Sequence, residues 1–525
     1  MSNILLILFP TQLFEFLHIK KIFDYNFENN KNNQKMNIIL FEHPYFFTKY
    51  LFHKMKLILH RSSMKNYLDL LKKNKKINPL YIEYNELEKI DFFIKSNKIN
   101  EIRFFNPIEQ ELIDLILNNK IFINTLKLIF PSPYFLNCDK SNKNNEIFEN
   151  LGGLRHDLFY KSQRINFNIM VKKEGEKYIP EGSKWSFDIE NRKPFEKTQE
   201  EPKILNLKSK KRDEYLNEAF KYIEKNFSNN YGISDLKNFI YPINRKEALL
   251  WLQNFISYKL DNFGKYEDAL HSKIKFGYHS ILSPLTNIGL ITPKDIIDNV
   301  DKYKKNLASK EGFIRQVIGW REYCYFSYQL FKKELETHNI YSKNKNKIPK
   351  SVWECQTQIK PIDNILKNLE LYAYSHHIER LMGIGNFLIL IEVSPEEIYK
   401  WFQTMYIDAY DVFMIPNVYG MLCYGKLTEK SHLMTRPYFA SSNYIMKMSD
   451  YKSDKCVKIN NIEYKWDEIL DSLYWAHVYK YSEEFKKIYA TASAVSRFNK
   501  FDSSKKKNIL ELSNIYKKWI HGCKI

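Results

Sequence analysis

Short apolar runs alternate with amphipathic stretches through the first quarter of the chain. The runs cover residues 3–10, 37–43, 79–84 and 101–107, and each ends at proline or polar residues. Between the second and third runs, FHKMKLILHRSSMKNYLDLLKKN has the apolar spacing of a helix. Strands that alternate with helices predict an α/β domain with a parallel sheet over residues 1–135. The turn after the first run, FPTQLF, lacks the glycine-rich dinucleotide-binding pattern.

The hydrophobic pattern weakens between residues 136 and 212, which we interpret as a connector. CDKSNKNNE and KKEGEKYIPEGSK are polar and loop-like, and ENRKPFEKTQEEPK resembles a linker. Between the first two lies LRHDLFYKSQRINFNIM, which has helical spacing and several cationic and aromatic residues.

From residue 213 to residue 525 apolar residues recur every three or four positions. Examples are residues 213–227, 245–260, 312–330 and 362–381, and glycine and proline mostly fall between such stretches. The pattern predicts a large all-helical domain after the connector, with no internal repeat.

Composition adds a bias in charge. The 525 residues carry 81 Lys and Arg against 61 Asp and Glu, a net charge of +20. This favours a polyanionic partner, nucleic acid or an anionic membrane surface, although a bias toward Lys, Asn and Ile codons would also produce it. No apolar stretch approaches the roughly 18 residues of a membrane span, and MSNILLILFP is typical of a buried strand rather than a signal peptide. We expect a soluble, intracellular and monomeric protein, in the cytoplasm, nucleoid or nucleus.

Residues 278–290 contain two serines just before a proline that opens an apolar run. Hydroxyls such as those of Ser280 and Ser283, and free backbone N–H groups near Leu282, can bind phosphate at a helix start. The same residues can form a simple helix cap, so both roles stay open.

Several charged residues lie within apolar, aromatic stretches. Arg315, Gln316, Arg321 and Glu322 lie among Trp and Tyr, which suits either an ion-pair network or a ligand cavity. Asp408 lies in WFQTMYIDAYDVFMIPNVYGM, which we predict to be helical. A buried carboxylate is costly unless it is bonded, so we expect a cation or ligand hydroxyls beside it.

Two adjacent histidines begin SHHIERLMGIGNFLIL. On a helix His376 and His377 would lie about 100° apart, so one could face a cavity while the other packs. Zinc ligands usually recur at four-residue spacing, and the six cysteines form no C-x-x-C pair, so we predict no protein-bound metal. The alternative is that these are hydrogen-bonded histidines of the core.

Residues 436–451 combine Tyr, Ser, Asn and basic residues, which suits nucleic-acid contact or an ordinary turn and helix.

Collinear motifs over nearly the whole chain resemble the photolyase/cryptochrome superfamily, and most of all its bacterial (6-4) photolyase branch. They include FPTQLFE, FEHPYFF, LRHDLFYKSQR, KWSFDIENR, FGKYEDA, LSPLTNIGL, GFIRQVIGWREY, SHHIERLMGIGNF and SSNYIMKMSDY. The resemblance implies a Rossmann-like antenna domain at the N-terminus and an all-α domain that binds FAD.

The resemblance also implies roles for individual residues. His377 would face the lesion, with His376 and Tyr438 beside it. The residues implied around FAD are Tyr266, Ser280, Leu282, Ser283, Gln316, Arg321, Glu322, Asp408 and Met414. Those implied in electron transfer to the flavin are Trp401, Trp353 and Tyr444. Those at the edge of a lumazine antenna pocket are Phe9, Thr11, Gln12, Leu13 and Glu42. Those implied near DNA are Lys161, Arg164, Lys447 and Asp188, the last linked to Mg²⁺ assistance.

The chain departs from the branch at two places. The branch carries an iron–sulfur cluster, but SDY is followed here by residues 452–455, KSDK, and Glu468 stands where another cysteine is expected. We therefore predict no iron–sulfur cluster. Met414 replaces the usual acidic residue near flavin N5. The resemblance leaves the lumazine antenna and Mg²⁺ assistance open.

The function implied by the resemblance is DNA repair driven by blue light. Reduced FAD would transfer an electron to a flipped-out (6-4) pyrimidine–pyrimidone photoproduct, and the partner would be UV-damaged DNA. The alternatives are a photolyase for cyclobutane dimers, a cryptochrome-like photoreceptor without repair, and a flavin-free DNA-binding protein.

Overall fold

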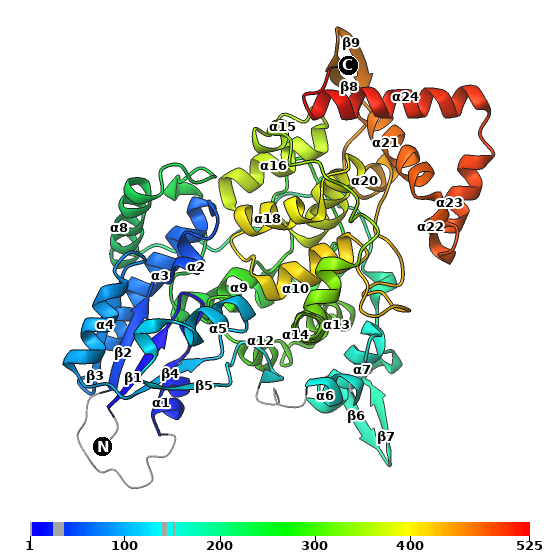
Figure 1. Ribbon diagram of the computed structural model, residues 1–525. Coiled ribbons are helices and arrows are strands. Elements are labelled where there is room, and N and C mark those ends of the chain that lie inside the picture. The colour runs from blue at the N-terminus through cyan, green and yellow to red at the C-terminus, as the bar shows by residue number, and fades with distance from the viewer. Residues whose placement is uncertain (1–2, 25–35, 139–143, 151–152, 525) are drawn as a thin grey trace.

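The computed structural model of the chain describes residues 3–24, 36–138, 144–150 and 153–524. Figure 1 shows an α/β part in blue and cyan, a helical part in green and yellow, and a C-terminal part in orange and red. No helix among the described residues is both long enough and apolar enough to cross a bilayer.

The N-terminal part is built on a five-stranded parallel sheet in the order β3-β2-β1-β4-β5. Its strands are β1 (Ile4–Leu8), β2 (Met36–Phe41), β3 (Ile77–Ile82), β4 (Glu101–Phe105) and β5 (Leu126–Phe130). The predicted α/β class and all four predicted strands are confirmed. Strand β5 was not predicted. It lies at the edge of the sheet and is half exposed, so its sequence lacks a continuous buried apolar run.

Helices surround this sheet, and one of them comes from later in the chain. The early helices are α1 (Phe16–Asp24), α2 (Pro44–Phe47), α3 (Lys54–Lys72), α4 (Leu87–Ser96), α5 (Gln110–Leu117) and η1 (Lys120–Phe122). Helix α8 (Lys210–Asn226) packs against α3. Arg61 of α3 binds Glu218 of α8 at 2.6 Å, and the hydroxyl of Tyr215 donates to Asp69 at 2.7 Å.

The connector contains more regular structure than its polarity suggested. Its helices are α6 (Asn144–Asn150) and α7 (His156–Asn166), followed by η3 (Glu181–Ser183) and η4 (Asp188–Glu190). The predicted helix within residues 154–170 is confirmed. The predicted loop at residues 172–184 is wrong in part, because β6 (Val171–Glu174) and β7 (Lys177–Pro180) form an antiparallel hairpin there. Gly175 at its tip adopts the positive φ that such a tight turn needs.

The remainder is mostly helical. Its α-helices are α9 (Arg245–Tyr258), α10 (Leu260–Phe263), α11 (Ser283–Thr286), α12 (Pro293–Val300), α13 (Leu307–Ile314), α14 (Arg321–Thr337), α15 (Lys350–Trp353), α16 (Lys360–Tyr372), α17 (Asn386–Leu390), α18 (Pro395–Met405), α19 (Asp411–Met414), α20 (Ser442–Met448), α21 (Trp466–Lys480), α22 (Ser482–Phe485), α23 (Tyr489–Asn499) and α24 (Ser503–Ile520). A 3₁₀ turn, η5 (Leu236–Asn238), precedes α9, and three π-helical segments interrupt the domain: η6 (Arg315–Trp320), η7 (Glu379–Gly385) and η8 (Ile415–Leu422).

Three local predictions for this part are corrected. The helix predicted over residues 362–381 breaks, because Ala373 takes a left-handed conformation and ends α16, so His376 lies outside any helix. Asp408 is not helical, because it lies in the turn between α18 and α19. A hairpin of β8 (Lys455–Ile459) and β9 (Ile462–Lys465) follows the SDY motif, so the domain is not purely helical.

A buried polar cluster joins the α/β part to the helical part. The carboxylate of Asp411 accepts hydrogen bonds from the hydroxyl of Tyr45 and the amide of Gln403, both at 2.7 Å. Glu109 is buried nearby, and its Oε2 has no hydrogen-bond partner. Burial and the charge of Asp411 raise the pKa of the Glu109 carboxyl well above its ordinary value of 4.5. Folding therefore favours the neutral form of this carboxyl relative to the unfolded chain.

Replacing Glu109 by glutamine is expected to raise the midpoint of urea unfolding at pH 8 and to leave it unchanged at pH 4. Because the pKa is raised on folding, unfolding releases a proton above pH 4.5, and the free energy of unfolding falls as pH rises. The substitution removes this loss, which we expect to be about 1–3 kcal/mol at pH 8. Glu111→Gln, at an exposed neighbour, is the control. An equal gain at both pH values would contradict a titrating Glu109.

Candidate functional site

A cavity of about 590 Å³ lies within the helical part, and all three π-helical segments contribute to its wall. Segments of this kind often occur at functional sites. The predicted site residues that line the cavity are Asp188, Ser280, Leu282, Ser283, Gln316, Arg321, His377, Asp408, Met414 and Tyr438. The structure therefore brings together residues that are up to 250 positions apart in the chain.

Asp408 has the cationic partner that its burial required. Arg380 of η7 binds its carboxylate through both terminal nitrogens, at 2.9 and 3.0 Å. Ser283 donates its hydroxyl to the same carboxylate at 2.5 Å, and Asn287 donates its amide to the backbone oxygen of Asp408 at 2.8 Å. Arg380 was not singled out from the sequence, although it stands in the same short motif as the two histidines.

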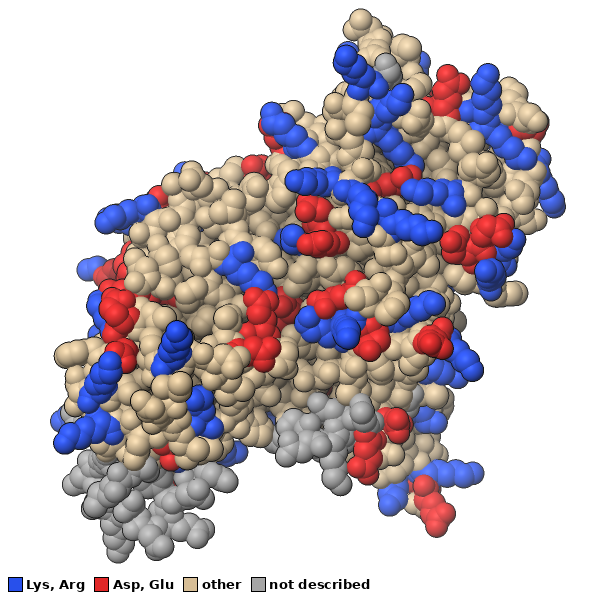
Figure 2. Space-filling model, in the orientation of Figure 1, with Lys and Arg blue, Asp and Glu red and all other residues tan. Residues whose placement is uncertain are grey.

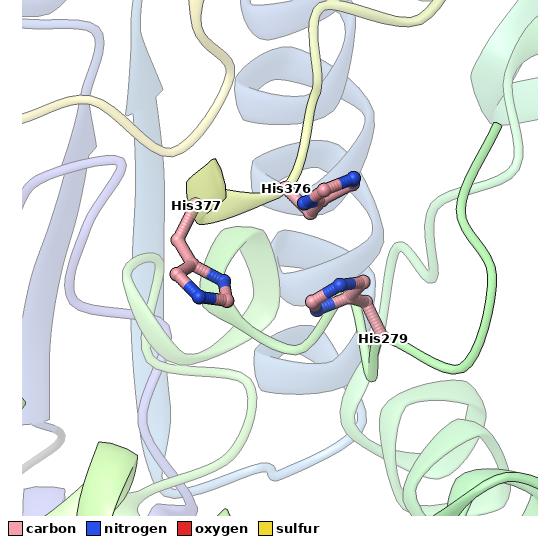
Figure 3. Close-up of side chains that lie close together, drawn as sticks. All are labelled: His279, His376 and His377. Atoms are coloured by element: carbon pink, nitrogen blue, oxygen red, sulfur yellow. The ribbon is translucent and has the colours of Figure 1, made fainter. Parts of the chain in front are cut away.

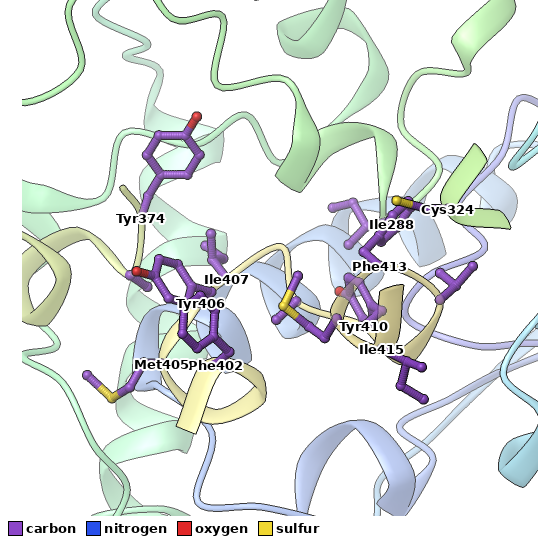
Figure 4. Close-up of a cluster of buried hydrophobic side chains, with 14 of the residues drawn as sticks. Ile288, Cys324, Tyr374, Phe402, Met405, Tyr406, Ile407, Tyr410, Phe413 and Ile415 are labelled. Carbon is purple, nitrogen blue, oxygen red and sulfur yellow. The ribbon is translucent and has the colours of Figure 1, made fainter. Parts of the chain in front are cut away.

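Apolar side chains flank the Asp408 turn on both sides. Figure 4 shows Phe402 and Tyr406 before the turn, and Tyr410 and Phe413 after it. Phe402, Phe413 and Met414 line the cavity. The ion pair of Asp408 thus lies against an apolar wall, where a charged pair interacts more strongly than in water.

Arg321 and Glu322 are adjacent but have different surroundings. Arg321 lines the cavity, donates to Asn287 at 2.6 Å, and packs on the rings of Tyr134 and Phe413 at 5.0 and 4.7 Å. Glu322 is fully buried behind the wall, and its carboxylate accepts the backbone N–H groups of Leu136 and Asn137. Glu322 therefore holds the chain segment that supports Arg321, and it lies outside the residues that line the cavity.

A second group of charges lies at the wall near η6. Arg315 binds Asp188 at 2.8 Å, and its Nη2 is buried without a hydrogen-bond partner. The amide of Gln316 donates to Glu267 at 2.6 Å. Burial raises the pKa of the Glu267 carboxyl to about 7. Asp188 is paired with Arg192 as well, so its carboxylate is held between two guanidinium groups.

His376 and His377 differ in exposure, although helical spacing is not the reason, because His376 lies outside any helix. The side chain of His377 lines the cavity and is 48% exposed, whereas His376 is buried. His377 Nε2 lies 3.4 Å from Asp268. Burial lowers the pKa of His377, but the hydrogen bond and charge of Asp268 outweigh it and raise that pKa. Burial and the charge of His377 hold the pKa of His376 well below its ordinary value.

Two of the three aromatic residues expected in electron transfer are neighbours. The rings of Trp401 and Trp353 lie 6.3 Å apart, and Tyr231 stacks on Trp353 at 4.2 Å. Tyr444 lies on α20, and its part in electron transfer stays a prediction. Tyr231 is the residue that sequence reasoning missed, because only the fold brings it to Trp353.

Tyr266 lies beside the cavity rather than on its wall. Its ring stacks on Tyr278 at 5.4 Å and packs against Phe195 at 5.0 Å, and its hydroxyl donates to Glu196 at 3.0 Å. The cofactor contact that the resemblance implies for this residue stays a prediction.

The residues expected at an antenna pocket are all buried. Glu42 is paired with Arg61 at 2.9 Å and accepts hydrogen bonds from Tyr81 and Tyr222. Gln12 donates its amide to the backbone oxygen of Phe105 and accepts the N–H of Phe9, while Thr11 and Leu13 lie in the same turn. These contacts hold the turn after β1 in place.

The residues expected at DNA differ in exposure. Lys161 and Lys447 are exposed. Arg164 is fully buried and donates to the backbone oxygens of Trp185 and Ile169, so the prediction that it contacts DNA is wrong. Figure 2 shows basic and acidic side chains interspersed over one face of the molecule, without a large area of one sign.

The chain has recognisable relatives. Residues 11–241 match the family described as deoxyribodipyrimidine photo-lyase-related protein. A (6-4) photolyase of Agrobacterium fabrum is 33% identical over 341 residues, which are 63% of this chain and 64% of that relative. Two solved structures have a similar fold, each with a TM-score of 0.54. They are a bacterial class III photolyase from Agrobacterium tumefaciens (15% identity, 98% of each chain) and a cryptochrome from Synechocystis (12% identity, 97% of this chain and 94% of that one).

Proposed function

Since this chain has the photolyase/cryptochrome fold and is related in sequence to a (6-4) photolyase, we propose that it is an FAD-dependent enzyme that repairs (6-4) photoproducts in DNA under blue light. The observation that carries the proposal is the position of His377. It faces a cavity large enough for a cofactor, and Asp268 lies 3.4 Å from its Nε2, where the carboxylate raises the imidazole pKa and so favours the protonated form that a general acid needs.

The cavity wall fits FAD in size and in chemistry. About 590 Å³ lies within the usual range of cofactor pockets, about 300–1,000 Å³. Arg315 lines the cavity, and its Nη2 is buried without a hydrogen-bond partner. Ser280 and Ser283 line the same cavity. Phe402, Phe413 and Met414 form an apolar part of the same wall. A ligand with a charged diphosphate and a flat aromatic ring system would satisfy both parts.

Seven of the expected residues line the cavity and would hold FAD: Ser280, Leu282, Ser283, Gln316, Arg321, Asp408 and Met414. Bound FAD would supply light-driven one-electron chemistry, which no protein side chain offers. The chain would bind the cofactor, keep water from its apolar side, and fix the charges around it. The Arg380–Asp408 pair would set the orientation of the carboxylate toward the cavity. We keep the lumazine antenna and Mg²⁺ near Asp188 as further proposals.

The lesion would enter from the side of His377 and Tyr438. Flipping a base out of the stack costs least where pairing is already damaged, which favours a lesion over normal thymine. His377 would hold a proton at its imidazole and donate it as negative charge develops on the lesion. Exposed Lys161 and Lys447 would contact phosphates, which makes binding sensitive to salt.

The test is repair of a defined oligonucleotide by the purified full-length chain under reducing conditions. One substrate carries a single (6-4) photoproduct, and a matched substrate carries a cyclobutane dimer. We expect blue light to restore normal thymines in the first substrate, with no repair in the dark. Repair of the second substrate alone would reverse the lesion assignment. Bound, photoreducible flavin without repair of either would favour a photoreceptor, and a colourless protein would reject the FAD proposal.

A further inference from the structure

Three histidine rings from two distant segments of the chain meet beside the cavity, where His279 and His377 line the wall and His376 is buried. His279 comes from the segment before α11, and His376 and His377 follow α16 (Figure 3). One ring nitrogen from each lies within 4.8 Å of one from each of the others. In the described part of the chain, no other three His, Cys, Asp or Glu residues gather in this way.

Each of these rings has an oxygen-bearing neighbour that could hold one of its nitrogens. His377 Nε2 lies 3.4 Å from Asp268, and His376 Nε2 lies 3.7 Å from Glu379. The ring of His279 is hydrogen-bonded to the backbone of Glu267. Imidazoles that bind metals almost always donate their other N–H to such a group, which fixes the tautomer and the orientation of the ring. His377 and His279 have such a partner, and Glu379 lies beside His376 Nε2 at 3.7 Å, just beyond hydrogen-bond distance.

The remaining nitrogens are short of partners. His279 Nε2 and His376 Nδ1 have no hydrogen-bond partner, although both side chains are more than nine-tenths buried. Buried polar atoms are nearly always paired, so each exception needs a reason. A bound ion that accepts a lone pair from each of these two rings would explain why both nitrogens lack a partner in the protein.

We propose that His279, His376 and His377 form a binding site for a divalent transition-metal ion, of which Zn²⁺ is the representative. Three imidazoles with a fourth position open to a cavity are a donor set that Zn²⁺ takes in proteins. His279 and His376 are stacked at 4.4 Å with an interplanar angle of 7°. One ring must therefore turn about its Cβ–Cγ bond before both lone pairs can point at one ion.

The site has a consequence that rests on the proposed function. Because His377 would be a metal ligand, Zn²⁺ would compete with its role as proton donor. Zn²⁺ should then inhibit light-dependent repair, and a chelator should restore it. Metal binding itself needs neither light nor DNA, so failure of the site and failure of the repair proposal can be distinguished.

The experiment is a titration of the full-length chain with Co²⁺ in the dark, followed by displacement with Zn²⁺. Flavin absorption is removed by difference spectra. We expect one equivalent with the visible bands of tetrahedral Co²⁺, and at least a tenfold weaker affinity in His279→Ala. His271→Ala is the matched control, because this histidine lies in the same segment but pairs with Asp450, and its affinity should not change.

A second variant guards against misfolding of the first. Glu379→Gln keeps the size of the side chain and should weaken Co²⁺ binding about 10–100-fold. Near-UV circular dichroism checks the fold of both variants. Absence of tetrahedral bands, or an affinity that is the same in wild type and both variants, would overturn the site. Binding without inhibition of repair would retain the site and reject His377 as the proton donor.

Discussion

Replacing His377 by alanine is expected to lower the rate of light-dependent (6-4) repair by about 10²–10⁴-fold, the usual contribution of a general acid. The reason is the position of this side chain, which faces the cavity and is held by Asp268 at 3.4 Å. The measurement is single-turnover repair under constant blue light, with the protein in excess over the damaged oligonucleotide, so that the chemical step rather than binding is observed.

Two readouts separate this effect from damage to the fold. Flavin absorbance should show unchanged FAD content, a mobility-shift titration should show unchanged affinity for the damaged oligonucleotide, and both should match the wild type. His432→Ala is the control, because His432 is half-buried, stacks on Tyr424 at 4.1 Å, and does not line the cavity. Repair by His377→Ala within twofold of the wild type would remove this residue from the mechanism.

The parallel sheet could be predicted because four of its strands are buried or nearly so. A buried strand appears as a short apolar run, which the sequence shows directly. The hairpins β6–β7 and β8–β9 carry lysines on exposed positions, which dilutes their apolar signal, and the edge strand β5 leaves Leu126 and Ile129 exposed. Pairing with a neighbour, rather than local sequence, makes these segments strands.

Residues of the candidate site could be predicted from the sequence only where burying the residue would have a clear cost in free energy. Asp408 is an example, since a carboxylate in an apolar stretch requires a partner. That partner is Arg380, and its identity depends on how η7 packs against the turn after α18. The spacing of residues along the sequence does not show this packing. Arg164 shows the opposite failure. It was placed near DNA together with the exposed lysines, whereas the fold buries it against backbone oxygens.

Contacts between distant segments were beyond sequence reasoning altogether. The resemblance named Trp401 and Trp353, but it did not indicate that Tyr231 stacks on Trp353. The sequence did not indicate His279 either, because zinc-binding histidines are recognisable from spacing only when they lie in one segment. The three-histidine group requires the loop before α11 and the segment after α16 to meet.

Replacing Arg380 by methionine is expected to lower the free energy of unfolding by about 3–5 kcal/mol, the usual cost of leaving one member of a buried ion pair alone. Asp408 is 5% exposed and would keep only Ser283 and water as partners for its charge. We also expect the variant to lose FAD during purification, since the carboxylate would no longer be fixed at the cavity wall. Urea unfolding and the flavin-to-protein absorbance ratio are the two measurements.

A double variant decides whether the charge itself is responsible. Asp408→Asn in the Arg380→Met background removes the unpaired carboxylate, so it should recover a substantial part of the lost stability, and the deviation from additivity measures the coupling of the pair. Arg497→Met, at an exposed position on α23, is the control and should change stability by less than about 0.5 kcal/mol. If the double variant were less stable than Arg380→Met by the full cost of Asp408→Asn alone, the two residues would be uncoupled. Arg380 would then act through packing on Tyr406, whose ring it covers at 4.2 Å, and not through its charge.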